Sequence, residues 1–236
     1  MPLDILALAA HRDDVEQTCA GTLLKMAEHG YRTGILDLTQ GEMGTRGTAE
    51  DREREAAEAA RILKVAWRHA LDIPDGRVEN TWENRLKVVS VLREQRPRVL
   101  ILPYWEGRHP DHYTASILGY EAAFLSGLAK LPLEGPAHRP FKIIYASLYR
   151  DVRPTFVVDI TDQFETRFAA LMAYKSQFTD QEAGSGIFPA QKEIRARIES
   201  MARYYGMFGG VTYAEPFLQK EIGLIDDVMA IPVKSI

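Results

Sequence analysis

An apolar run near the start of the chain places the strongest constraint on the fold. Residues 3–10, LDILALAA, are almost continuously apolar and do not alternate with polar residues. A strand with one face in solvent would show that alternation, so this pattern predicts a strand buried on both faces. Strands of this kind are typical of parallel sheets that are covered by helices on both sides.

Strand and helix patterns alternate along the rest of the chain. Further strands are predicted at 32–39, 66–73, 98–104, 142–149 and 155–160, the last of them antiparallel or at an edge. Helices are predicted at 15–29, 49–63, 81–95, 110–127, 163–175 and 188–205. This order with short loops predicts one Rossmann-like three-layer α/β/α domain over residues 1–236, with a mostly parallel sheet.

Composition sets the class of protein. The chain is 46% hydrophobic and 26% charged, as in ordinary globular proteins, and its net charge of −4 gives no general attraction to nucleic acid or to membranes. The single cysteine, Cys19, cannot form an internal disulfide, and we interpret it as a buried helix residue. The first apolar run is too short for a membrane span and has no basic leader, so we predict a cytoplasmic protein.

Polar clusters follow three of the predicted strands directly. They are His11–Glu16 after the first strand, Gln40–Gly47 after the second, and Arg108–His112 after the strand at 98–104. Because parallel sheets bind ligands outside the carboxyl ends of their strands, we expect these clusters to meet in one crevice.

The first and third clusters contain residue types that bind metals. His11 is followed by two acids, Asp13 and Asp14, while His109 and His112 lie about one helical turn apart. Taken alone, adjacent acids after a strand are most often a helix cap, and an HxxH pair is most often an ordinary surface or core pair. Together, at one crevice, they favour a catalytic zinc site, which takes three protein ligands and leaves a position for water.

These segments resemble a known family. "AHRDDVE" is similar to the AHPDDxE signature of the LmbE/PIG-L-like zinc N-deacetylases, and "RHPDH" resembles their second motif. Longer tracts, including "GYRTGILDLTQGEMGTRGT" and "YGMFGGVTYAEPF", resemble the bacillithiol-pathway branch, which deacetylates N-acetylglucosaminyl malate. Arg12 departs from the signature, which has proline there. The resemblance implies a small-molecule N-acetylated amino sugar as substrate and a homo-oligomer, such as a hexamer.

The resemblance also implies roles for six residues. The metal, Zn²⁺ or alternatively Fe²⁺, is expected on His11, Asp14 and His112. Asp13 is then the general base that takes a proton from the attacking water. His109 is the acid or oxyanion-stabilising partner, with Asp111 expected to orient its ring and keep its pKa up.

Candidate substrate contacts come from three regions. The loop residues Gln40, Glu42 and Met43 are expected to reach sugar hydroxyls, because the neighbouring glycines allow close backbone approach. Arg52 and Arg108 are candidates for binding a malate-like carboxylate, although Arg52 fits a solvated helix face equally well. Gln177 is a candidate pocket residue, and the candidates for an oxyanion-binding tyrosine are Tyr149, Tyr204 and Tyr205.

Two alternatives remain at this point. The substrate of the same chemistry could be another amide, such as an N-acetylated chitooligosaccharide or a thiol conjugate. The chain could also be a non-catalytic Rossmann-like module that binds a nucleotide or sugar. The absence of GxGxxG after the first strand argues against dinucleotide binding.

Overall fold

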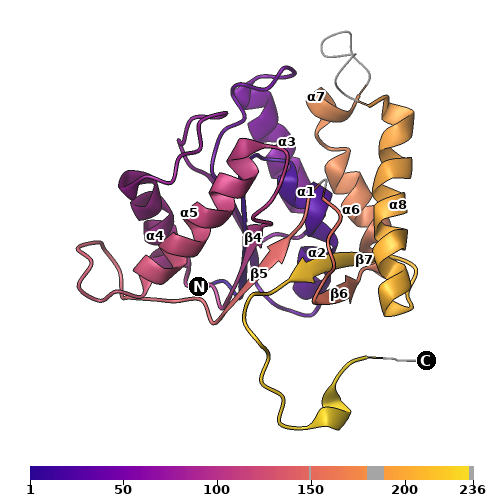
Figure 1. The fold of residues 1–236 in the computed structure, drawn as a ribbon. Helices are drawn as coiled ribbons and strands as arrows, with labels where there is room; N and C mark the ends of the chain where they lie inside the picture. Colours follow the sequence, from indigo (N-terminus) through magenta and orange to yellow (C-terminus); the bar gives the residue numbers. More distant parts are fainter. Residues whose placement is uncertain (149, 180–188, 234–236) are drawn as a thin grey trace.

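The sheet is mostly parallel, as predicted. A computed structural model describes residues 1–148, 150–179 and 189–233, and within them a seven-stranded sheet has the order β3-β2-β1-β4-β5-β7-β6 (Figure 1). The first five strands of that order are parallel, and β7 is antiparallel to both of its neighbours. The bounds are β1 Ile5–Ala9, β2 Thr33–Asp37, β3 Trp67–Ala70, β4 Val99–Pro103, β5 Lys142–Ala146, β6 Phe156–Asp159 and β7 Ala214–Leu218.

Helices cover both faces of the sheet, which explains the continuous apolar run. On β1, Leu6 and Leu8 point into a core cluster that also holds residues of α4 (Trp82–Gln95) and α5 (Pro110–Ser126). The intervening Ile5, Ala7 and Ala9 point into a second cluster beneath the helices of the opposite face. These are α1 (Asp14–Thr18), α2 (Ala20–Glu28), α3 (Ala49–Ile62) and α6 (Phe164–Leu171). The three-layer arrangement is therefore confirmed.

Two predictions about secondary structure were wrong, and Glu215 is involved in both. The helix predicted at 15–29 is two helices, α1 and α2, with a break at Cys19. Glu215 lies on β7, a strand that was not predicted, and its buried carboxylate accepts hydrogen bonds from the backbone N–H groups of Gly21 and Thr22. An acid at that position satisfies the N–H groups left open at the start of α2.

The other helices follow the predictions with shifted ends. The segment predicted at 163–175 is a 3-10 turn (Thr161–Gln163), α6 and α7 (Lys175–Phe178), and the helix predicted at 188–205 is α8 (Gln191–Gly209), with residue 188 outside the described residues. A second 3-10 turn spans Val228–Ala230. No helix in the described ranges is both long enough and apolar enough to cross a membrane. Edge strand β6 pairs antiparallel with β7, as the pattern at 155–160 indicated.

The strand order places the crevice between β1 and β4. These two strands are neighbours, while the chain after β1 builds the sheet outward on the other side through β2 and β3. Such a reversal of strand order opens a crevice at the carboxyl ends of the strands. His11 follows β1 and the segment 108–112 follows β4, so both histidine motifs border this crevice.

Candidate metal centre

Three predicted ligands lie together in the crevice. His11 Nδ1 is 3.1 Å from His112 Nε2, and the Asp14 carboxylate lies between the two elements. Asp14 Oδ1 is 3.2 Å from His112 Nε2, and Asp14 Oδ2 is 3.5 Å from His11 Nδ1. The loop after β1, the first residue of α1 and the first turn of α5 supply the three groups.

This donor set fits a metal ion. Ligand atoms about 2.0–2.2 Å from a tetrahedral zinc ion lie roughly 3.3–3.5 Å from one another, close to the three separations found here. Two imidazoles and one carboxylate also form a ligand set suited to zinc or ferrous iron. The residues present therefore fit a divalent metal.

The carboxylates around His11 favour a positive charge at its position. Burial by itself lowers the pKa of His11, but the charge of Asp14 and hydrogen bonds with Asp111, Asp14 and Asp75 raise it to about 12 without a metal. The pKa of Asp14 is held well below its ordinary value by His112 and His11, although burial opposes this. The carboxylates favour a positive charge at this point, and a divalent ion supplies it more fully than a proton does.

Asp75 and Asp111 hold the far side of the His11 ring. His11 Nε2 is 3.1 Å from Asp75 Oδ1 and 3.4 Å from Asp111 Oδ2. The Asp111 carboxylate also accepts the Gly76 N–H at 2.8 Å, so it is fixed in place. It was expected behind His109 and instead faces His11. Asp75 was missed, although it is an acid in the loop after β3, at the edge where the other clusters meet.

Asp13 is separate from the donor cluster. It occupies the N-cap position of α1, yet its side chain makes no capping hydrogen bond there. Its carboxylate instead accepts hydrogen bonds from Arg52 Nη2 at 2.8 Å and from Gln17 Nε2 at 3.3 Å. Arg52 is 4% exposed, which excludes the solvated helix face, and its charge is directed to Asp13. The two adjacent acids therefore have different partners.

A buried polar network holds the backbone of this motif. The carbonyl of Arg12 accepts hydrogen bonds from Arg68 Nη2 and from the hydroxyl of Tyr174. Arg68 in turn pairs with Glu16 at 2.6 Å and with Asp37 at 2.8 Å. Burial raises the pKa of Glu16 to about 7, with Arg68 opposing the rise. These hydrogen bonds therefore hold the peptide group between Arg12 and Asp13 in place.

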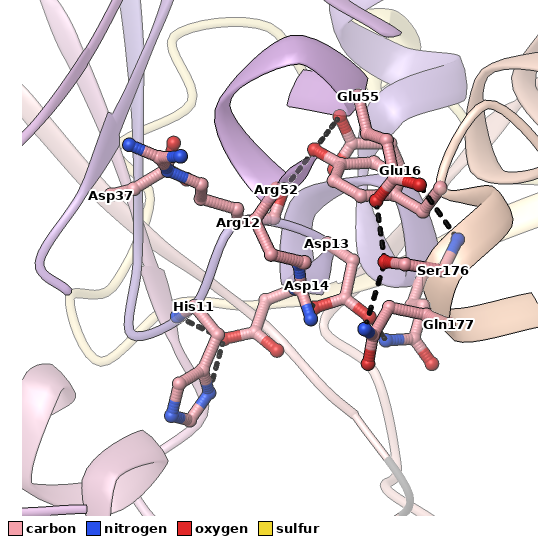
Figure 2. Close-up of polar contacts among 12 residues, drawn as sticks. His11, Arg12, Asp13, Asp14, Glu16, Asp37, Arg52, Glu55, Ser176 and Gln177 are labelled. Carbon is pink, nitrogen blue, oxygen red and sulfur yellow. Dashed lines mark hydrogen bonds and ion pairs between the residues drawn. The ribbon is translucent and has the colours of Figure 1, made fainter. Parts of the chain in front are cut away.

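The side chain of Arg12 turns away from the metal ligands. Figure 2 shows it beside Asp37, and its Nη1 donates to the carbonyl of Ala49 at 2.9 Å. Ala49 is the first residue of α3, the helix that carries Arg52. Arg12 therefore ties the motif to α3, a link that a proline at this position cannot provide.

His109 and Arg108 form the open side of the centre, and both are exposed. His109 caps α5, since its Nδ1 accepts the N–H of Asp111 at 3.2 Å, and its ring centroid is 4.8 Å from that of His11 and 5.0 Å from that of His112. Burial and the neighbouring His11 and His112 lower the pKa of His109 without a metal. The charge of Asp111 raises the pKa of His109, as expected, but burial and the two neighbouring imidazoles outweigh it.

The loop after β2 is tied to the same centre. Glu42 accepts the Asp75 N–H at 2.8 Å, and the Met43 N–H donates to the Asp75 carboxylate at 3.0 Å. Gln177 is buried and donates to the carbonyl of Arg46 at 2.6 Å, so it anchors this loop. Gln40 and Met43 are exposed at its surface.

A small, largely apolar pocket adjoins the donor cluster. Asp14 and His112 lie in its wall together with Tyr104, and most of the remaining lining is apolar. Of the tyrosines expected near an oxyanion, Tyr204 is exposed on α8 and Tyr205 is buried with its hydroxyl against the Val152 N–H. Tyr149 lies outside the described residues. Tyr104, directly after β4, lies in the pocket wall and was not among these candidates.

Comparison with known proteins identifies the family. Residues 6–123 match the PIG-L family model, described as GlcNAc-PI de-N-acetylase. Diacetylchitobiose deacetylase of Thermococcus kodakarensis is 31% identical over 224 residues, which cover 89% of this chain and 80% of that protein. The chain belongs to the PIG-L family. It is therefore a hydrolytic N-deacetylase, and the non-catalytic alternative is excluded.

Solved structures of other proteins share the fold. The conserved protein TT1542 from Thermus thermophilus superposes with a TM-score of 0.86 at 42% identity, covering 94% of this chain and 97% of that one. The N,N'-diacetylchitobiose deacetylase from Pyrococcus horikoshii has a TM-score of 0.79 at 26% identity, covering 90% and 82%.

Proposed function

We propose that this PIG-L enzyme removes the acetyl group of N-acetyl-α-D-glucosaminyl L-malate, a step of bacillithiol biosynthesis. One observation carries the chemistry: a His11–Asp14–His112 donor cluster lies beside an acid, Asp13, that is outside the cluster and held by Arg52. A metal hydrolase needs both, because one group must hold the ion while another handles the proton.

Asp13 and His109 divide the proton transfers. When bound by His11, Asp14 and His112, the metal supplies Lewis acidity and a water of lowered pKa. Asp13 would accept a proton from the water that attacks the acetamide carbonyl, and Arg52 keeps the carboxylate in position. His109, on the open side, delivers a proton to the departing amine. The apolar pocket beside Asp14 and His112 receives the acetyl methyl group.

The preference for a carboxylated aglycone rests on the similarity of the longer sequence tracts and on Arg108. Arg108 is exposed at the rim next to His109, whereas Arg52 is buried against Asp13. An exposed guanidinium beside the reacting centre suits the two carboxylates of a malate group. The loop residues Gln40, Glu42 and Met43 face the sugar, with Gln177 behind them as the anchor of the loop.

Diacetylchitobiose is the second candidate substrate. It is favoured by the 31% identity, over 89% of this chain, to a protein named as a deacetylase of that disaccharide. A chitooligosaccharide carries no carboxylate, so it makes no use of a rim arginine.

A substrate panel separates the two candidates. We expect amine release from N-acetylglucosaminyl malate to exceed release from N-acetylglucosamine and from diacetylchitobiose in kcat/KM by at least about 10-fold, the scale of one charge-assisted contact. Equal values would remove the case for carboxylate recognition, and a preference for diacetylchitobiose would select the second candidate. Chelation should abolish activity on every substrate, and returning Zn²⁺ or Fe²⁺ one at a time identifies the working metal.

We further propose that residues 1–236 act as one domain, in the cytoplasm and as a homo-oligomer. One sheet contains strands from Ile5 to Leu218, which supports a single domain.

A further inference from the structure

The loop after β2 must be held in place before it can present a defined surface to a substrate. We define the β2 loop as residues 40–47, QGEMGTRG, whose three glycines allow many backbone conformations. Most of its residues are exposed, but Arg46 is buried, with 5% of the residue exposed. A charged side chain is rarely buried unless its donors have partners. The contacts of Arg46 therefore indicate what fixes the loop.

Arg46 and Gln177 form a reciprocal pair. Arg46 Nη1 donates to the carbonyl of Gln177 at 3.1 Å and to that of Thr179 at 3.3 Å, while Gln177 Nε2 donates to the carbonyl of Arg46 at 2.6 Å. The two carbonyls lie at the C-terminal end of α7, where no further helical turn supplies N–H partners. The guanidinium of Arg46 satisfies these acceptors. Each side chain of the pair thus holds the backbone of the other segment.

The loop backbone also packs directly against α7. Gly47 has a φ of +71°, and a Cβ atom at this position would lie 2.7 Å from Ser176 Cβ and Oγ, so only glycine fits there. Ser176 is itself fixed, because the Glu55 carboxylate of α3 accepts hydrogen bonds from its N–H at 2.6 Å and from its hydroxyl at 2.7 Å (Figure 2). Helix α7 is therefore held by α3 and in turn supports the loop.

The first half of the loop reaches the metal centre. Its contact there is Asp75, which binds the loop through Glu42 and the Met43 N–H and lies 3.1 Å from His11 Nε2. The loop is thus held at two points, by Asp75 beside a metal ligand and by α7 through Arg46. The second point fixes how the exposed part of the loop lies relative to the metal.

We propose that Arg46 is a positioning residue for substrate binding, which acts with Gln177 by holding the exposed residues of the β2 loop where they meet the sugar. The inference rests on the proposed function in one respect, namely that this loop faces the sugar of the substrate. The metal ligands and Asp13 are held by other elements, since Arg52 of α3 fixes Asp13. Loss of the Arg46–Gln177 pair should therefore raise KM far more than it lowers kcat.

Steady-state kinetics test this division. In Arg46→Met we expect KM to rise by about 10-fold, the scale of one lost charge-assisted hydrogen bond, with kcat within about 2-fold of wild type and metal content unchanged. The rise should be equal for N-acetylglucosamine, diacetylchitobiose and N-acetylglucosaminyl malate, because all three contain the sugar. Gln177→Leu should act in the same direction, and Arg46→Lys, which keeps a charged donor, should recover part of the loss. Arg61→Met alters an exposed arginine of α3 that pairs with Glu58, and this control should keep the wild-type KM.

Amide hydrogen exchange tests the loop without any substrate. Peptides that cover residues 40–47 should exchange about 10-fold faster in Arg46→Met and Gln177→Leu than in wild type, while peptides from β1 and α5 stay unchanged. This readout separates failure of the pair from failure of the proposed function. Circular dichroism checks folding, and Arg46→Lys with Gln177→Leu carry the test if Arg46→Met does not fold.

Three results would overturn the proposal. The first is unchanged exchange in the loop of folded variants, which would show that the pair does not hold it. The second is faster exchange with an unchanged KM, which would show that the position of the loop does not matter for binding. The third is a loss of kcat and metal together, which would assign Arg46 to the stability of the metal centre instead.

Discussion

The two histidine motifs of the metal centre differ in how firmly the protein holds them. The segment 11–14 is held by a buried hydrogen-bond network. Arg68 and Tyr174 donate to the carbonyl of Arg12, and Arg52 donates to the carboxylate of Asp13. The segment 108–112 has two exposed residues, Arg108 and His109, ahead of the helix that fixes the rest.

This difference separates two tasks within one site. Ligands and a general base need a fixed geometry, which packed and hydrogen-bonded groups supply. Groups that meet the substrate must be open to solvent before it binds. We infer that the residues of the buried motif, together with His109 and His112, act in the chemical step, and that Arg108 on the open side sets affinity for the substrate.

The largest effect is expected from Asp13→Asn. It should keep the metal and lower kcat by about 10²–10⁴-fold, the scale of general-base catalysis. Asp14→Asn should lose metal instead, so metal content measured beside amine release separates the two acids. Asp72→Asn, an exposed acid paired with Lys87, is the matched control and should behave as wild type. Full turnover in Asp13→Asn would refute its role as base.

A smaller effect is expected on the far side of the His11 ring. Asp111→Asn removes the negative charge that faces Nε2 while leaving an acceptor for the Gly76 N–H. Partners that orient a metal-bound histidine are typically worth about 10–100-fold in metal affinity. Competition with a chromophoric chelator measures this. Unchanged affinity would show that Asp75 alone positions the ring.

The open motif is tested by Arg108→Ala. We expect KM for N-acetylglucosaminyl malate to rise by about 10-fold, since one charge-assisted contact is lost, while kcat changes little. KM for N-acetylglucosamine should stay the same, because that substrate lacks the carboxylates. Arg150→Ala, an exposed arginine that pairs with Glu106, controls for general loss of positive charge. A parallel rise with both substrates would contradict carboxylate recognition.

Sequence periodicity predicted the parts of the fold that depend on local pattern. The buried run at 3–10, the parallel order and the meeting of the two histidine motifs all follow from features within single elements. The break at Cys19 and strand β7 could not be predicted in this way, because the start of α2 is stabilised by a hydrogen bond to Glu215, almost 200 residues away in the sequence. Asp75 and Arg52 were misjudged for the same reason: an acid in a loop and an arginine on a charged helix acquire partners only once the sheet edge is assembled.

Tyr174→Phe gives the smallest effect and tests the network beneath the buried motif. The variant removes the hydrogen bonds of the hydroxyl to the carbonyl of Arg12 and to Glu16 Oε1, and leaves the hydrogen bond from Arg68 to that carbonyl in place. We expect a loss of about 1 kcal/mol in the free energy of unfolding, measured with urea, because the hydroxyl is buried and its partner is shared. If the network also positions Asp13, kcat should fall by less than about 10-fold with KM and metal content unchanged, since the peptide keeps one of its two donors. A change in KM alone would place the effect on the substrate side instead, and would weaken the division between the two motifs.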